Sequence, residues 1–132
     1  MKFLGIDFGD KYVGLSLAEE PLNIAFPYKV VENKGKKSLV SQILKIIQEQ
    51  GVNKVIVGLP YGLSANFTEQ TRKTESFVNL LKESIDIPVE TFDERLTTKS
   101  ILQKGEKISH DSSAALILQR WLEKRKFLNK HL

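Results

Sequence analysis

Four acidic residues lie at or next to the ends of segments that the sequence predicts to be buried. Asp7 closes a short apolar run near the start of the chain, Asp93 and Glu94 follow a later apolar run, and Asp111 opens the last helical segment. Ala115 follows Asp111 at helical spacing, which places this acid on the apolar stripe of its helix. An acid on an inward stripe is costly unless it is paired, capped or bound to a metal ion. These positions are therefore candidates for chemistry.

The composition narrows what such acids can do. The chain has no cysteine and two histidines, which excludes a thiolate zinc site and a cysteine nucleophile and argues against a Ser/His/Asp triad. Carboxylates without these residues favour a hard cation such as Mg²⁺ or Mn²⁺, which leaves coordination positions for phosphate oxygens. Two such ions about 3.5–4 Å apart activate a water and stabilise the leaving oxygen in phosphodiester cleavage. The residue types therefore favour metal-dependent hydrolysis of nucleic acid.

Each acid also has a simpler structural explanation. Asp7 is a natural turn residue, and Asp111 at the start of a helix would gain about 0.3–1 kcal/mol from the helix dipole. Asp93 or Glu94 could form an ion pair with a neighbouring arginine or lysine. Function is favoured because acids from separate segments fall at one predicted edge of the fold.

The first third of the chain predicts three antiparallel strands. Apolar residues dominate residues 2–8, alternate with small residues over 12–18, and return over 24–31, with short connections between the runs. Pro27 in the third run favours an edge strand or a bulge.

The spacing of apolar residues then changes, and the rest of the chain predicts helices that alternate with strands. Ser38 is expected to cap a helix that Gly51 closes. The elements expected next are a strand at 55–57, a helix at 68–84, a strand at 87–92, a short helix at 97–104 and a last helix at 111–126. This order predicts an α/β fold in one domain, residues 1–132, with a mixed five-stranded sheet and helices on both faces. Ligands bind such sheets at the carboxyl ends of the strands, where the acids fall.

The charge balance permits a polyanionic partner. Lysine and arginine number 20 against 16 acids, a net charge of +4, which suits nucleic acid without requiring it. The basic residues gather around positions 29–37, 99–107 and 120–130, where solvated faces explain them equally well. No segment is apolar and long enough to span a bilayer, so we expect no membrane contact and a cytoplasmic protein.

Four sequence motifs resemble those of the YqgF/RuvX family. They are Gly5-Ile6-Asp7-Phe8-Gly9 with Lys11 and Gly14, Val57-Gly58-Leu59-Pro60, Asp93-Glu94-Arg95-Leu96-Thr97-Thr98, and Asp111-Ser112-Ser113-Ala114-Ala115 followed by Ile117-Leu118. Their order and spacing are those of the family. The resemblance implies an RNase H-like fold and a metal-dependent nuclease, described as maturing the 5′ end of pre-16S ribosomal RNA or as resolving Holliday junctions.

The resemblance also implies roles for charged residues. Asp7, Glu94 and Asp111 match the family's catalytic acids, which would bind Mg²⁺ or Mn²⁺. Lys11 and Arg95 would contact phosphates of the substrate.

Small residues beside the acids would complete the substrate site. Gly5, Gly9 and Gly14 would let the backbone and a scissile phosphate approach closely. Thr97 would contact a phosphate or, alternatively, cap the short helix that follows it.

Two departures from the family pattern bear on substrate choice. Tyr12 stands where the family usually has arginine, and residues 61–66 replace the usual Asn-Met-Asp-Gly-Thr after the Gly-Leu-Pro motif. His110 and Trp121 are minor candidates, His110 for proton transfer and Trp121 for base stacking, but a helix start and a core position are the simpler explanations.

Two other functions compete with a nuclease. The segment 5–9 also resembles the first phosphate motif of the actin, sugar-kinase and chaperone ATPase superfamily, whose duplicated second half 132 residues cannot hold. A non-catalytic ribosome-assembly factor would keep the acids and bind RNA without cleaving it. Structured RNA is the expected partner and branched DNA the rival. The protein is expected to be a monomer or a homodimer, and a symmetric junction calls for the dimer.

Overall fold

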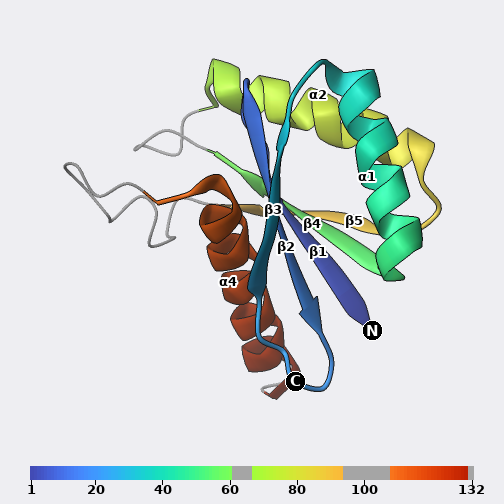
Figure 1. Ribbon diagram of the computed structural model, residues 1–132. Coiled ribbons are helices and arrows are strands. Elements are labelled where there is room, and N and C mark those ends of the chain that lie inside the picture. Colours follow the sequence, from blue (N-terminus) through green and yellow to red (C-terminus); the bar gives the residue numbers. More distant parts are fainter. Residues whose placement is uncertain (61–66, 94–107, 131–132) are drawn as a thin grey trace.

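Five strands form one mixed sheet in the order β3-β2-β1-β4-β5 (Figure 1). The computed structural model describes residues 1–60, 67–93 and 108–130. β1 (Lys2–Asp7) pairs antiparallel with β2 (Tyr12–Glu19), and β2 pairs antiparallel with β3 (Phe26–Glu32). The predicted three-stranded meander is therefore confirmed.

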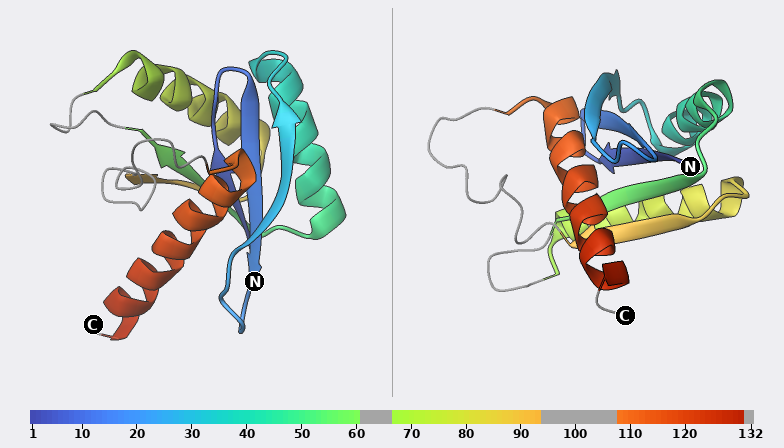
Figure 2. Two further views of the ribbon diagram at one scale, coloured as in Figure 1. Left: turned by 60° about the vertical axis from the view of Figure 1, so that its left-hand side comes forward. Right: turned by 90° about the horizontal axis from the view of Figure 1, so that it is seen from below.

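The second half of the sheet is parallel, and helices cover both of its faces. β4 (Lys54–Leu59) pairs with β1, and β5 (Val89–Asp93) pairs with β4 as the outer strand. α1 (Lys36–Gln50) and α2 (Glu69–Ser84) lie on one face, and α4 (His110–Lys130) crosses the other (Figures 1 and 2). None of the described helices is long and apolar enough to cross a membrane.

The alternation of side chains along the strands divides the core between the two faces. Leu4 and Ile6 of β1 are fully buried in the cluster under α1 and α2, together with Val13 and Leu15 of β2. The intervening residues point the other way, and Phe3 packs with the apolar side of α4. Because successive side chains on a strand face opposite sides, β1 serves both cores at once.

The ends of several elements follow local signals in the sequence. Gly51 closes α1 in the left-handed conformation, with φ 69°, and Thr68 and Thr71 form a capping box at the start of α2. The pairing of β2 with β3 shifts register between Leu15 and Ser16, opposite Pro27. The predicted bulge or edge strand is thus confirmed in both respects, because β3 is also an outer strand.

Other boundaries differ from the sequence prediction. α1 begins at Lys36 after Gly35, with no side-chain cap, so Ser38 lies in the first turn and is not the cap. β3 begins at Phe26 rather than at residue 24, because the Ala25 N–H donates to Gln119 Oε1 of α4 at 2.9 Å instead of joining the sheet. α4 runs on to Lys130 because no glycine or proline stops it at residue 126.

Candidate active site

Asp7 is the last residue of β1, at the carboxyl edge of the sheet. Asp7 is paired with Gly14 of β2, and 4% of its surface is exposed to solvent. Asp7 therefore belongs to the strand ladder and not to the turn that follows it. The next residue, Phe8, is also buried and stacks on Phe77 of α2 with the ring centroids 4.9 Å apart. The end of β1 is thus anchored on both sides of Asp7.

The first turn of α4 lies directly against Gly14. A Cβ atom built on Gly14 would overlap the carbonyl oxygen of His110 and lie 2.8 Å from the backbone nitrogen of Asp111. Gly14 is therefore needed so that the helix can approach the sheet. The expectation that Gly14 admits a substrate phosphate is wrong, since the backbone of α4 fills that space.

The same kind of contact recurs at Gly5, two residues before Asp7. A Cβ on Gly5 would overlap Ser16 Oγ and lie 2.8 Å from Leu118 Cβ. Ser16 in turn donates a 2.8 Å hydrogen bond to the carbonyl oxygen of Ala114. The glycine therefore serves helix packing here too, and the predicted phosphate approach at Gly5 is also wrong.

These contacts bring Asp111 to the same edge and face as Asp7. Residues directly opposite each other on antiparallel strands point to the same face of the sheet. Asp7 is opposite Gly14, whose missing side chain would point at Asp111, so the Asp7 carboxylate also projects on the α4 side. The structure thus brings together two of the acids that the sequence singled out.

Asp111 lies in the first turn of α4 and is half-buried. Its Oδ1 accepts a 3.0 Å hydrogen bond from the Ser112 N–H, as an acid at a helix start does. The buried stripe of α4 contains Ala114 rather than Ala115, followed by Leu118. Asp111 therefore lies at the border of the buried stripe, at the edge of the sheet where β1 ends at Asp7.

The residues present fit a divalent cation. Asp7 and Asp111 offer oxygen donors from two different elements, which is the donor chemistry that Mg²⁺ and Mn²⁺ prefer. Within the described residues no group of three or more acids or histidines is placed to hold a metal ion. A complete site therefore needs a donor from elsewhere in the chain, the substrate or water.

The turn between β1 and β2 is held by a residue that the sequence analysis missed. Asn33 donates from its side chain to the carbonyl oxygen of Gly9 at 2.9 Å and from its backbone N–H to that of Lys11 at 2.8 Å. On the other side, Lys73 Nζ of α2 lies 3.4 Å from Asp10 Oδ1. The Asn-x-Gly spacing at Asn33–Gly35 is a turn signal that could have pointed to this residue. The fixed turn presents exposed Lys11 at the same edge of the sheet as Asp7.

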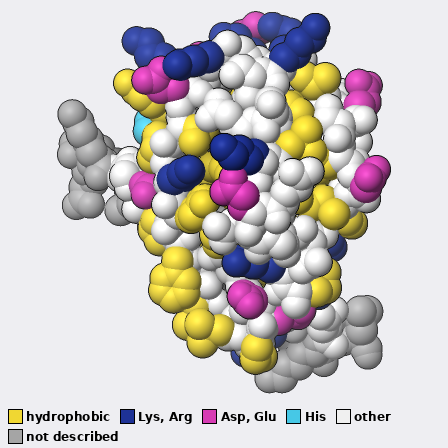
Figure 3. Space-filling view, turned by 45° about the vertical axis from the view of Figure 1, so that its right-hand side comes forward, with side chains coloured by type: hydrophobic (Ala, Val, Ile, Leu, Met, Phe, Trp, Pro, Cys, Tyr) yellow, Lys and Arg dark blue, Asp and Glu magenta, His cyan; other side chains and the backbone are white. Residues whose placement is uncertain are grey.

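Exposed lysines also lie at this end of the sheet, near the start of α1. Lys34, Lys36 and Lys37 lie between the end of β3 and the first turn of α1. Figure 3 shows lysine and arginine side chains gathered at this end of the molecule, at the top of the view. Arg72 is engaged by Glu69, and this hydrogen bond lowers the pKa of the Glu69 carboxyl. The lysines therefore make this end of the molecule positive on the side of α1 and α2.

Two minor candidates have structural roles. Trp121 is 9% exposed and its Nε1 donates to Glu90 at 2.8 Å, so it is a core residue and not a base-stacking platform. His110 is exposed in the first turn of α4, with its ring centroid 5.6 Å from that of Tyr12. Tyr12, where the sequence departs from the resembled pattern, therefore contacts the start of the helix that carries Asp111.

Several predicted site residues lie outside the described residues. They are Glu94, Arg95, Thr97, the segment 61–66 and the short helix expected at 97–104. Their predicted roles remain predictions.

The fold is that of an RNase H-like resolvase. The structure of Thermus thermophilus RuvC in complex with a Holliday junction substrate superposes with a TM-score of 0.63 over 96% of this chain and 96% of that chain, at 17% sequence identity. Uncomplexed Thermus thermophilus RuvC gives a TM-score of 0.61 at the same coverage and identity. The predicted RNase H-like architecture is therefore confirmed.

Sequence comparison then defines the family. The family model described as "RuvX: Holliday junction resolvase" matches residues 1–124, and the chain belongs to this family. A protein of Maridesulfovibrio salexigens is 36% identical over 132 residues, covering 92% of this chain and 98% of its own length. A protein of Dictyoglomus thermophilum is 32% identical over 133 residues, covering 93% and 96%. Both carry the name "Putative pre-16S rRNA nuclease".

The resemblance seen in the motifs is thus confirmed over nearly the whole chain. Membership places the protein in a family of nucleases, which are hydrolases acting on ester bonds.

Proposed function

We propose that this protein is a nuclease that uses Mg²⁺ or Mn²⁺ to cleave precursor 16S ribosomal RNA. The observation that carries the proposal is the convergence of Asp7 and Asp111 at the carboxyl edge of the sheet, on the side covered by α4. Ligands on α/β sheets bind at this edge. The names of the full-length relatives from Maridesulfovibrio and Dictyoglomus support the choice of substrate.

Asp7 and Asp111 would hold the metal ion, with Glu94 as the third acid. Such an ion activates a water and stabilises the leaving oxygen of a phosphodiester. Burial of Asp7 in the strand ladder fixes the direction of its carboxylate. The packing of α4 on Gly14 fixes the direction of Asp111 in the same way. The chain therefore supplies a preorganised pair of oxygen donors, which is what metal-assisted hydrolysis needs.

The lysines around the edge bind and orient the substrate. Lys11 lies in the turn that Asn33 fixes after β1, and it is exposed for contact with a phosphate. Lys34, Lys36 and Lys37 extend the positive surface toward α1. Arg95 and Thr97 would add contacts from the segment after β5. Cations placed in this way lower the cost of bringing a polyanion to two carboxylates.

The proposal also covers the domain organisation of the protein, its location in the cell and its oligomeric state. Residues 1–132 act as one nuclease domain, because strands from both halves of the chain form one sheet. A ribosomal RNA precursor is a cytoplasmic substrate, so the protein acts in the cytoplasm. The rival substrate is a Holliday junction, which the description of the family favours. That substrate calls for a homodimer with two sites, whereas RNA processing is compatible with a monomer.

A side-by-side cleavage assay tests this function. End-labelled precursor 16S RNA and a four-way DNA junction are each incubated with the protein in Mg²⁺, in Mn²⁺ and in EDTA. We expect cleavage of the RNA that requires the metal ion, and we expect Asp7→Asn to lower it by more than about 100-fold, since a lost ligand weakens the metal site.

Asp10→Asn is the matched control. Asp10 lies three residues from Asp7, but its side chain is 60% exposed and paired with Lys73, so cleavage should stay near the wild-type rate. Cleavage of the junction alone would replace the proposed substrate by branched DNA. Binding of the RNA with no cleavage in any metal would instead establish a non-catalytic assembly factor.

A further inference from the structure

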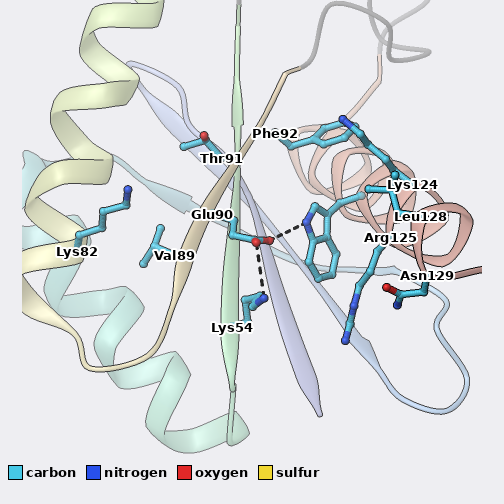
Figure 4. Close-up of a pocket in the computed structure, with 11 residues that line it drawn as sticks. Lys54, Lys82, Val89, Glu90, Thr91, Phe92, Lys124, Arg125, Leu128 and Asn129 are labelled. Carbon is cyan, nitrogen blue, oxygen red and sulfur yellow. Dashed lines mark hydrogen bonds and ion pairs between the residues drawn. The ribbon is translucent and has the colours of Figure 1, made fainter. Parts of the chain in front are cut away.

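A groove of about 500 Å³ follows the outer edge of the sheet, with β5 as its floor (Figure 4). Lys82 of α2 lies on one side, and Lys124 and Arg125 of α4 lie on the other. Phe92 projects from β5 toward α4, with the Lys124 ammonium 6.0 Å from its ring centroid. The groove therefore presents cations on both sides of β5 and an aromatic ring on the α4 side.

The acid that lines this groove is already engaged. Glu90 Oε2 accepts a 2.8 Å hydrogen bond from Trp121 Nε1, and Glu90 Oε1 lies 3.7 Å from Lys54 Nζ. In the described part of the chain, Lys82 and Lys124 have no carboxylate within ion-pair distance. The charge that the groove offers to a ligand is therefore positive.

The upper end of the groove is level with Asp7. Ile6 lies opposite Val57 of β4, and Val57 lies opposite Thr91 of β5, so Phe92 is one residue further on, level with Asp7. Because neighbouring strands are about 4.8 Å apart, Asp7 and Phe92 are separated by about 10 Å across the sheet. Phe92 packs against the core under α4, the face to which Asp7 also points.

We propose that this groove binds a single-stranded stretch of the nucleic-acid substrate next to the cleavage site, which rests on the nuclease function proposed above. A strand held at Asp7 and Asp111 continues across the sheet to Phe92, where a base stacks on the ring. Its phosphates then contact Lys82 and Lys124. Proteins bind single strands in this manner, with cations along the backbone and aromatic rings under the bases.

A purely protective role for the lysines explains less of the groove. Charged residues on an outer strand prevent that strand from pairing with another chain. Here Lys82 and Lys124 project from the flanking helices, and β5 itself contributes Phe92, an aromatic ring, at the level of the acids. Protection of the edge strand explains neither why this residue of β5 is aromatic nor why it lies level with Asp7.

Binding measured without cleavage tests the proposal. A short fluorescein-labelled polyuridine RNA is titrated with protein in EDTA, and the anisotropy gives Kd at several salt concentrations. We expect the double variant Lys82→Gln/Lys124→Gln to bind about tenfold more weakly than wild type. The slope of log K against log salt should become shallower by about 1.4, since each phosphate contact to a single strand contributes about 0.7.

Lys2→Gln/Lys45→Gln is the matched control, because it removes the same charge from residues that do not line the groove. Lys2 bonds Gln50 of α1, and Lys45 lies on α1 with its side chain 78% exposed. We expect its Kd and salt slope to stay close to those of wild type. Equal weakening in both double variants would overturn the proposal, because net charge alone would then explain it.

Phe92→Leu separates stacking from charge. It keeps an apolar side chain on β5 but removes the aromatic ring, so we expect about tenfold weaker binding with the salt slope unchanged. Wild-type protein that fails to bind the RNA, or groove variants that bind as tightly as the control, would overturn the groove proposal. A nuclease that cleaves normally in that case leaves the proposed function intact. If the protein binds RNA through the groove but cleaves nothing, the proposed nuclease function is refuted and the groove proposal stands.

Discussion

The two faces of the sheet are built in different ways. Among the described residues, the face under α1 and α2 buries fifteen apolar side chains in one cluster, whereas the face under α4 buries seven. The α4 face compensates with close backbone approach at Gly5 and Gly14 and with the buried hydrogen bond from Ser16 to α4. The first face is a conventional apolar core, and the second fixes the position of one helix.

This difference separates stability from function. Burial of apolar area supplies most of the free energy of folding, so the larger cluster under α1 and α2 should dominate the stability of the domain. The α4 face holds Asp111 beside Asp7, so small displacements there should change activity first. Substitutions on the two faces should therefore affect different measurements.

The largest expected effect on stability comes from Phe77→Ala on the α1–α2 face. Phe77 is fully buried and stacks on Phe8, so its truncation should cost about 3–5 kcal/mol of unfolding free energy. Urea denaturation followed by circular dichroism measures this loss. Because Phe8 adjoins Asp7, cleavage per folded molecule should fall somewhat, but by less than for a substitution that moves α4. A large loss of activity in fully folded protein would break the division between the faces.

Among the substitutions that compare the two faces, Gly14→Ala should give the largest effect on activity. The added Cβ would occupy the place of the His110 carbonyl, so the first turn of α4 must move and carry Asp111 away from Asp7. A displacement of about 1 Å in a catalytic site can cost about 100-fold in rate. We expect kcat/KM for RNA cleavage to fall by about this factor in protein that remains folded.

Gly51→Ala is the matched substitution on the other face. Gly51 ends α1 with a positive φ of 69°, so alanine there should cost about 1 kcal/mol of stability. Its kcat/KM should equal that of wild type. Equal activities for the Gly14 and Gly51 variants would show that the approach of α4 does not position the site.

Ser16→Ala should give a smaller effect of the same kind. Loss of the buried hydrogen bond to Ala114 should cost about 1 kcal/mol of unfolding free energy. Ser84→Ala removes the same type of bond, to the Leu80 carbonyl at 2.7 Å, on the exposed side of α2. Its cost should stay within about 0.5 kcal/mol. Equal costs in urea denaturation would contradict a special role for the buried bond.

Periodicity in the sequence was sufficient to predict the fold. The alternation over 12–18 and the helical stripe ending at Gly51 specify which sides are buried, and the order of elements then favours a mixed sheet with helices on both faces. Asp7 and Asp111 were found for the same reason, because both lie where a buried segment meets the predicted edge.

Most of the errors about the site and the strands involve partners distant in the sequence. The phosphate role predicted for Gly5 and Gly14 failed because their neighbours on α4 are about a hundred positions away and appear only with the register of the strands. The start of β3 was misplaced because Ala25 bonds to Gln119 of α4. Ser38 was taken as a cap because the turn signal at Asn33–Gly35, which places the start of α1 directly after Gly35, was overlooked.

The central claim is that Asp7 and Asp111 form one metal site, and a calorimetric titration with Mn²⁺ tests it most directly. Wild type, Asp7→Asn, Asp111→Asn and the double variant are titrated in the absence of nucleic acid. If both acids bind the same ion, each single substitution should weaken Mn²⁺ binding strongly, and the double variant should be little worse than either single one. Wild-type affinity in Asp111→Asn, or losses that simply add in the double variant, would contradict a shared site.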